Sequence, residues 1–134
     1  MGGAVAVLNA MYLRLHLPPS TPVSSFTVGT PKIGNAAFAA WSDKVLAPVA
    51  INSVRIVNAH DIVPTLPLPL PLINWLPSGV EYHLQPNGRW YNCGSPSHYR
   101  TDSRCSDGYS EAHGSLDNHS NLGELSMIYG CAAT

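Results

Sequence analysis

The stretch that decides the fold is residues 23–57, VSSFTVGTPKIGNAAFAAWSDKVLAPVAINSVRIV. Residues 23–29 are rich in β-branched and aromatic side chains, which predicts a strand. After a turn, residues 36–46 predict a helix with Asn35 as its N-cap. Residues 52–57 predict a second strand. A strand, a helix and a strand joined by short connections predict a βαβ unit and a parallel sheet.

Apolar positions predict how the helices pack. One face of the helix over 36–46 is formed by three apolar residues, Phe38, Trp41 and Val45. Residues 2–17 predict an earlier helix that is apolar almost all round, which is typical of a buried helix. No strand precedes this earlier helix in the sequence. We expect the strand that should feed it to lie before Met1.

Beyond the βαβ unit the pattern changes. Residues 64–77 alternate leucine with proline, which excludes a central strand or a helix interior and predicts a stiff, extended, apolar loop. Residues 80–84 and 89–93 are strand-like and flank residues 85–88, QPNG, a hairpin signal. A short helix is predicted from about His119. The predicted fold class is therefore α/β, with a mostly parallel sheet flanked by helices and an antiparallel hairpin at its edge.

Composition and charge restrict the class of protein. The 134 residues suffice for one domain, and the 45% hydrophobic and 11% charged residues indicate a globular chain with a large buried fraction. The net charge is −1 and no basic block occurs, so nucleic acid is not an expected partner. No transmembrane segment is predicted, because proline interrupts the longest apolar stretch, residues 62–76. No metal-ligand cluster is evident, and no cofactor is expected.

The cysteines suggest a local disulfide. Cys93 and Cys105 flank a polar loop rich in Ser, Gly and Asp, and the alternative is a pair of free thiols. A disulfide that closes a loop of this size contributes roughly 3 kcal/mol in the chain-entropy model. Cys131 is left over, and we expect its partner, if it has one, to lie in a segment outside this sequence.

Asp61 is the first candidate for chemistry. It follows a predicted parallel strand, and the carboxyl ends of such strands are where sites gather in α/β sheets. A carboxylate there can orient an imidazole, although it can also simply cap a turn. Spacing alone favours none of the six histidines. No G-x-S-x-G motif occurs; the nearest match, residues 108–112 (GYSEA), fails at its last position and places Ser110 in a loop instead of a nucleophile elbow.

Four stretches together resemble the fungal class 3 lipases, a family of secreted triacylglycerol lipases and feruloyl esterases with the α/β-hydrolase fold. Residues 26–35, FTVGTPKIGN, resemble the family's F-T-F-G-x-P-[RK]-[VI]-G-N signature. Residues 55–67, RIVNAHDIVPTLP, resemble its R-[VI]-V-[NH]-x-x-D-x-V-P-x-L-P segment. Residues 1–4, MGGA, resemble the tail of its G-H-S-[LM]-G-G-A elbow, and residues 117–120, DNHS, its C-terminal D-H or D-x-H segment.

The resemblance implies roles by position. Asp61 matches the acid of a Ser–His–Asp triad, and His119 matches the base, with His113 as the alternative base. The nucleophilic serine matches the position immediately before Met1. Met1 and Gly2 match the part of the elbow that follows the serine, and Met1 aligns with an oxyanion-hole donor. The chain on its own is therefore expected to lack esterase activity.

The resemblance also implies a substrate class and a setting. We expect a lipid or another ester as substrate, met at a lipid–water interface, and a secreted protein. The apolar wall beside the acid is expected to consist of Ile62, Val63, Pro64 and Leu66, although these residues could equally form a loop packed on the core. Residues 1–134 are expected to be the C-terminal portion of one lipase-type domain. The alternative is a non-catalytic lipase remnant that serves as a lipid-binding or structural module.

Overall fold

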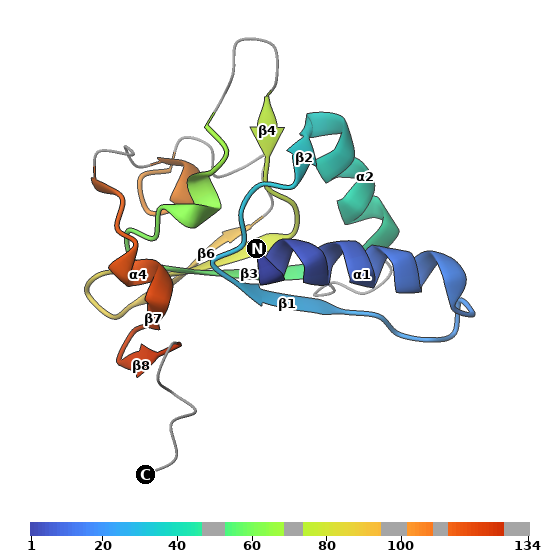
Figure 1. Cartoon of the computed structure of the whole chain (residues 1–134), viewed down its shortest axis with the longest axis horizontal. Helices are drawn as coiled ribbons and strands as arrows, with labels where there is room; N and C mark the ends of the chain where they lie inside the picture. The colour runs from blue at the N-terminus through green and yellow to red at the C-terminus, as the bar shows by residue number, and fades with distance from the viewer. Residues whose placement is uncertain (47–52, 69–73, 95–101, 109–112, 128–134) are drawn as a thin grey trace.

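The computed structural model describes residues 1–46, 53–68, 74–94, 102–108 and 113–127. These residues form a mostly parallel sheet with two helices on one of its faces (Figure 1). The elements follow one another in the order α1 (Gly2–His16), β1 (Ser25–Val28), β2 (Gly34–Asn35), α2 (Ala36–Leu46), β3 (Ser53–Asn58), η1 (Val63–Thr65), β4 (Trp75–Leu76), β5 (Val80–Leu84), β6 (Trp90–Gly94), η2 (Ser106–Gly108), α4 (Asp117–Ser120), β7 (Asn121–Leu122) and β8 (Leu125–Ser126).

The main sheet has the strand order β1-β3-β5-β6. Strand β3 is parallel to β1, where Ser25 faces Ser53, and also parallel to β5, where Val54 faces Val80. Strand β6 is antiparallel to β5 and forms the edge. The predicted α/β class, with its parallel sheet and antiparallel hairpin, is confirmed.

The hairpin between β5 and β6 closes where the sequence predicted it. The amide of Gln85 donates to the carbonyl of Arg89 at 2.9 Å, and Gly88 adopts a positive φ of 79° inside the turn. Glycine suits this conformation because it has no Cβ to clash with the backbone. The second strand runs from Trp90 to Gly94, one residue later than the prediction of 89–93.

Helix α1 is buried on one face only, so the expectation that it is buried all round is wrong. Val7, Ala10 and Met11 pack against β1 and α2, while the opposite face, which includes Tyr12, is exposed. The described residues supply neighbours to only one side of this helix. Its first turn approaches the sheet closely, since a Cβ on Gly3 would lie 2.2 Å from the Oγ1 of Thr30.

Helix α2 has the predicted bounds and the predicted cap, in which the amide of Phe38 donates to the Oδ1 of Asn35 at 2.9 Å. Its fully buried residues are Ala39, Ser42 and Leu46, and two residues of the predicted face, Phe38 and Val45, are partly buried against the core. Trp41 is 47% exposed. Ala39 and Ser42 are small and are almost fully buried, whereas the larger indole of Trp41 lies at the surface with its ring edge-on to that of Phe38.

The leucine–proline segment contains more regular structure than predicted. It includes the 3₁₀ turn η1 and the short strand β4, which pairs antiparallel with β2. Residues 69–73 of this segment lie outside the described residues. The short helix expected from about His119 is α4, which begins two residues earlier. Among the described helices, none combines the length and the apolar character needed to cross a bilayer.

Candidate active site

Asp61 is held in a fixed position just beyond the carboxyl end of β3. Its amide donates to the carbonyl of Asn58 at 2.8 Å, and its Oδ1 accepts from the amide of Val63 at 2.9 Å. The turn that leads to it contains Ala59 in a left-handed conformation, with φ 43°. Asp61 itself is 1% exposed. These contacts leave its Oδ2 to face a different partner.

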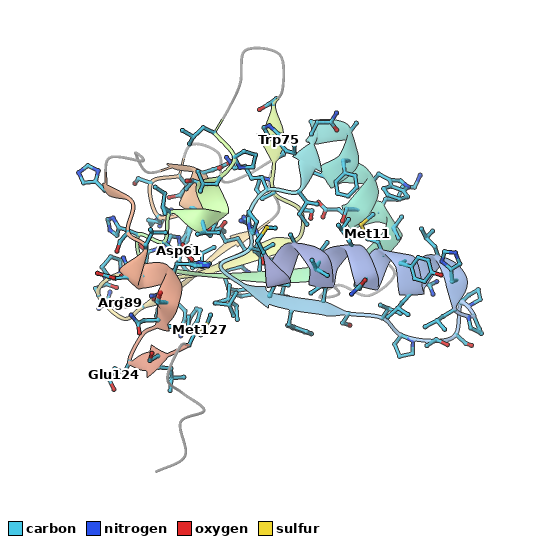
Figure 2. All side chains as sticks on the ribbon, viewed as in Figure 1. Met11, Asp61, Trp75, Arg89, Glu124 and Met127 are labelled. Atoms are coloured by element: carbon cyan, nitrogen blue, oxygen red, sulfur yellow. A yellow bond between two sulfur atoms is a disulfide. The ribbon has the colours of Figure 1, made fainter. Side chains whose placement is uncertain are left out.

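That partner is His119. Its Nδ1 lies 2.9 Å from the Oδ2 of Asp61, although the two residues are 58 positions apart in the sequence. Figure 2 shows Asp61 beside helix α4, which carries the histidine. The side chain of His119 is 32% exposed, whereas that of Asp61 is 2% exposed. A buried carboxylate therefore orients a partly exposed imidazole, whose Nε2 has no hydrogen-bond partner among the described residues.

Backbone pairing joins the segments that carry the acid and the base. Ser115 forms a parallel bridge with Asp61, and its amide donates to the carbonyl of His60 at 2.8 Å. The Oγ of Ser115 also accepts from the amide of Asn118 at 3.3 Å, at the start of α4. The loop before His119 is thus fixed to the same strand end as Asp61.

Gly29 provides the space in which the pair meets. It is buried at the carboxyl end of β1 and has φ 59°. A Cβ at this position would lie 2.6 Å from the Nδ1 of His119 and 2.8 Å from the Oδ2 of Asp61. Gly29 was not predicted as a site residue. Gly29 could have been predicted from its place at the end of a parallel strand, because functional sites gather at that edge of a sheet.

A buried polar cluster lies on the neighbouring strand β5. Glu81 accepts hydrogen bonds from the guanidinium of Arg55 and from the amide and Oγ of Ser106, at 2.8 and 2.6 Å. Burial raises the pKa of Glu81, but Arg55, His83 and Ser106 outweigh burial and hold that pKa at about 2. His83 lies 2.6 Å, through Nε2, from the carbonyl of Ala59. The cluster therefore reaches the turn that presents the acid.

A disulfide fixes the loop that supplies Ser106. Cys93 and Cys105 are joined with an S–S distance of 2.10 Å and enclose a sequence separation of 12 residues. Within the part of the chain that the structure describes, Glu81 and these two sulfurs form the one group of possible metal ligands that lie close together. The sulfurs are bonded to each other and are not thiolates, so the group does not suit a metal ion.

Comparison with known families shows which family the chain belongs to. The sequence profile described as Lipase (class 3) matches residues 1–70, which is more than half of the chain. The chain belongs to the class 3 lipase family. Its relatives include phospholipase A1 EG1, chloroplastic/mitochondrial, from Oryza sativa subsp. indica, which is 40% identical over 68 residues. They also include a lipase from Rhizopus niveus, 39% identical over 69 residues. Each match covers 50% of this chain, and 15% and 17% of the relative.

Solved lipase structures match almost the whole chain. Lipase II from Rhizopus niveus superposes with a TM-score of 0.76 at 30% identity, over 93% of this chain and 44% of that one. A propeptide complex of Rhizomucor miehei lipase gives 0.77 at 27% identity, over 98% and 40%. A triacylglycerol lipase whose catalytic centre is described as a serine protease triad gives 0.76 at 28%, over 98% and 47%. This class 3 lipase chain thus has the α/β-hydrolase fold and spans less than half the length of these structures.

The structure places the remaining predicted residues of the class 3 lipase chain in different surroundings. His113, the alternative base, is exposed, and its ring centroid lies 6.5 Å from that of His60. Met1 caps α1 and is 89% exposed, while a Cβ on Gly2 would meet nothing within 4 Å. Ser110 lies outside the described residues, and so does Cys131.

The four residues expected to form an apolar wall follow Asp61 directly. Pro64 is buried, whereas Ile62, Val63 and Leu66 are partly buried. A hollow of about 450 Å³ lies near α4, but none of the four lines it. Its lining comes from the end of β3, from the end of β5 and the turn after it, and from α4 and the residues that follow α4; it comprises Asn58, Ala59, His60, Leu84, Gln85, Pro86, Gly88, Asn118, Asn121 and Gly123.

Proposed function

We propose that Asp61 and His119 are the acid and the base of a Ser–His–Asp triad in a carboxylic-ester hydrolase that acts on lipids. The observation that carries this proposal is the 2.9 Å contact between the Oδ2 of Asp61 and the Nδ1 of His119. In such a triad the carboxylate holds the imidazole in the tautomer whose Nε2 can accept a proton. The buried acid and partly exposed base suit these roles.

The nucleophile is proposed to be a serine that precedes Met1. The first turn of α1 lies at the carboxyl edge of the sheet, because Gly3 abuts Thr30 and the adjacent Gly29 abuts His119. A residue just before α1 would therefore lie on the side of the imidazole. This is the strand-to-helix position that a nucleophile elbow occupies in α/β-hydrolases. Met1 and Gly2 would then belong to the elbow, and the Met1 nitrogen to the oxyanion hole.

The reaction follows from these positions. His119 takes the proton of the serine hydroxyl as the oxygen attacks the ester carbonyl, and Asp61 stabilises the resulting imidazolium. His119 then returns the proton to the leaving alcohol, and water hydrolyses the acyl-enzyme by the same route. The chain alone holds two of the three groups, so we expect it to hydrolyse no ester. Residues 1–134 are proposed to be the C-terminal portion of a single lipase-type domain.

Lipid esters are the proposed substrates, encountered at a lipid–water interface. The relatives from Rhizopus niveus and Oryza sativa are a lipase and a phospholipase A1, both enzymes that act on lipids. Burying an acyl chain against Ile62, Val63, Pro64 and Leu66 would contribute about 0.8 kcal/mol per CH₂ group. The disulfide between Cys93 and Cys105 supports an oxidising compartment, and we propose secretion on that ground.

A chimera tests the proposal. In it, this chain replaces the matching segment of lipase II from Rhizopus niveus, and the lipase supplies the remaining residues. We expect the chimera to hydrolyse a triacylglycerol emulsion and to react with a fluorophosphonate probe, while the chain alone does neither. If the folded chimera binds lipid vesicles but is inert, the alternative of a non-catalytic, lipid-binding lipase remnant is favoured.

A further inference from the structure

The helix that carries His119 is weakly anchored by apolar contacts. Helix α4 has four residues, and none of them is buried. A single helical turn is not stable by itself, because the cost of ordering its backbone exceeds what its few hydrogen bonds return. A catalytic base must nevertheless be held within a fraction of an ångström of its working position. Polar contacts from another element must therefore hold α4.

Asn58, the last residue of β3, makes such contacts. It is 6% exposed, and its Nδ2 donates to the carbonyls of Asn118 at 3.1 Å and Asn121 at 2.8 Å. Its Oδ1 accepts from the amide of Gly123 at 3.3 Å. Both N–H donors and the acceptor oxygen of the side chain are thus used. The three partners bracket His119 on either side.

We propose that Asn58 is a positioning residue for the catalytic base: its amide holds the backbone on both sides of His119, so that the imidazole meets Asp61. This inference rests on the proposed triad. Asn58 does not touch the imidazole and acts through the backbone of α4 and of the turn that follows. Asp61 lies three residues further along the same chain segment, so one strand end sets the position of both acid and base.

The chemistry of an amide explains why asparagine suits this position. The two carbonyls need donors and the Gly123 amide needs an acceptor, and one primary amide supplies both. Leucine has a similar volume but neither function. Aspartate keeps the acceptor for Gly123 and loses both donors. Asn58→Leu therefore keeps only the volume of the side chain, whereas Asn58→Asp keeps the volume and the acceptor for Gly123. The two variants together show whether the donors to the two carbonyls are needed.

NMR spectroscopy of this full chain tests the inference without any substrate. The first readout is the downfield proton signal of the His119 Nδ1–H, which reports its hydrogen bond to Asp61. The second is amide exchange at Gly123. In Asn58→Leu we expect the signal to disappear and exchange at Gly123 to accelerate roughly 10- to 100-fold, as for the loss of one or two hydrogen bonds.

A matched control comes from Asn121, the residue that directly follows α4. The side chain of Asn121 donates to the carbonyl of Asp117 at 2.8 Å, and this hydrogen bond is exposed. Asn121→Ala removes it and leaves the Asn121 carbonyl available to Asn58. We expect this variant to keep the His119 signal and to change exchange at Gly123 less than about threefold. If Asn58→Leu behaves like Asn121→Ala, the inference is overturned.

Asn58→Asp shows whether a lost His119 signal in Asn58→Leu is merely a consequence of unfolding. Amide protection along β3 and β5 shows whether each variant retains the sheet. If Asn58→Leu loses that protection, Asn58→Asp decides: we expect it to lose the His119 signal while Gly123 and the sheet stay protected. If Asn58→Asp also loses the sheet, or keeps the His119 signal, Asn58 is a general core residue and the inference fails.

The chimera separates this inference from the proposed function. There we expect Asn58→Leu to lower kcat roughly 10- to 100-fold with little change in KM, because it displaces the base and touches no substrate contact. Normal turnover in an Asp61→Asn chimera would overturn the triad, whatever the NMR results. Normal turnover in Asn58→Leu alongside an inactive Asp61→Asn chimera would overturn only the role of Asn58.

Discussion

No Cβ atom fits between Gly29 and His119. One built on Gly29 would lie 2.6 Å from the Nδ1 of the imidazole, the atom that faces Asp61. Gly29 directly follows β1, and Asp61 lies just beyond the end of the adjacent strand β3. The end of β1 thus leaves an open space, and the end of the parallel strand β3 supplies a carboxylate beside it. The imidazole enters that space from a third segment.

The first prediction concerns this space. In the chimera, Gly29→Ala should lower kcat on the order of 100-fold, because the new methyl group must push the base away from the acid. Gly88→Ala is the matched control, since Gly88 also has a positive φ and its Cβ would meet nothing within 4 Å. It should cost about 1 kcal/mol in stability and leave kcat unchanged. Equal kcat values for the two variants would show that the space at Gly29 is not needed.

The second prediction concerns the pair itself. In the chimera, Asp61→Asn and His119→Ala should each lower kcat by about 10³- to 10⁴-fold or more, and the double variant should be little worse than the poorer single variant. Members of a triad act as a unit, which explains the lack of additivity. His113→Ala is the control and should retain normal kcat, because His113 faces His60. Loss of turnover in His113→Ala would move the base to that residue.

The third prediction concerns pH. Burial raises the pKa of Glu81, but Arg55, His83 and Ser106 together hold it at about 2, against 4.5 for the unperturbed group. A lowered carboxyl pKa stabilises the fold fully above the unfolded value and less as the pH falls through the folded value. The free energy of unfolding should therefore fall between pH 4.5 and pH 2, by on the order of 3 kcal/mol from this group.

Urea denaturation at several pH values measures this contribution. Glu81→Gln should be less stable than the wild type at pH 6, because Arg55 keeps its buried charge without a carboxylate partner. The difference between the two proteins should shrink as the pH falls from 4.5 to 2. Glu124→Gln, at an exposed carboxyl, is the control and should follow the wild type. A constant difference across the range would contradict the assignment.

The fourth prediction concerns the disulfide. Replacing Cys93 and Cys105 with alanine should lower the free energy of unfolding by roughly 3 kcal/mol, as the chain-entropy model gives for a loop of this length. Reduction of the wild-type protein should have a similar effect. Ser106→Ala tests the loop in another way, by removing one hydrogen bond to Glu81 and keeping the disulfide. If the double alanine variant is as stable as the wild type, the loop is held by other contacts.

The sequence predicted those elements whose signals are local. Helix α2 has the predicted bounds because Asn35 caps its start and its neighbours are good helix formers. The hairpin around Gly88 follows from turn chemistry alone. The burial of α1 was predicted wrongly because burial depends on which neighbours surround a helix, and composition does not reveal them. Trp41 was misplaced for the same reason.

The meeting of Asp61 and His119 could not be predicted from spacing, because no local pattern connects residues 58 positions apart. Only the resemblance to a family suggested it. Asn58 lies in the stretch that resembles the family's segment, but its contacts could not be predicted, since the groups that it contacts are backbone atoms, which every residue has. Gly29 could be noticed only as a glycine at the end of a strand. The type of a residue does not reveal which backbone atoms its side chain contacts or where the fold leaves space beside it.

Because α4 buries none of its side chains, warming should release this short helix before the four-stranded sheet melts. An enzyme built around this site would then lose turnover at temperatures where circular dichroism still reports an intact fold. Cooling would restore activity at once, since re-forming one turn of helix requires no refolding of the sheet. Heat inactivation of the site would be reversible and would precede denaturation.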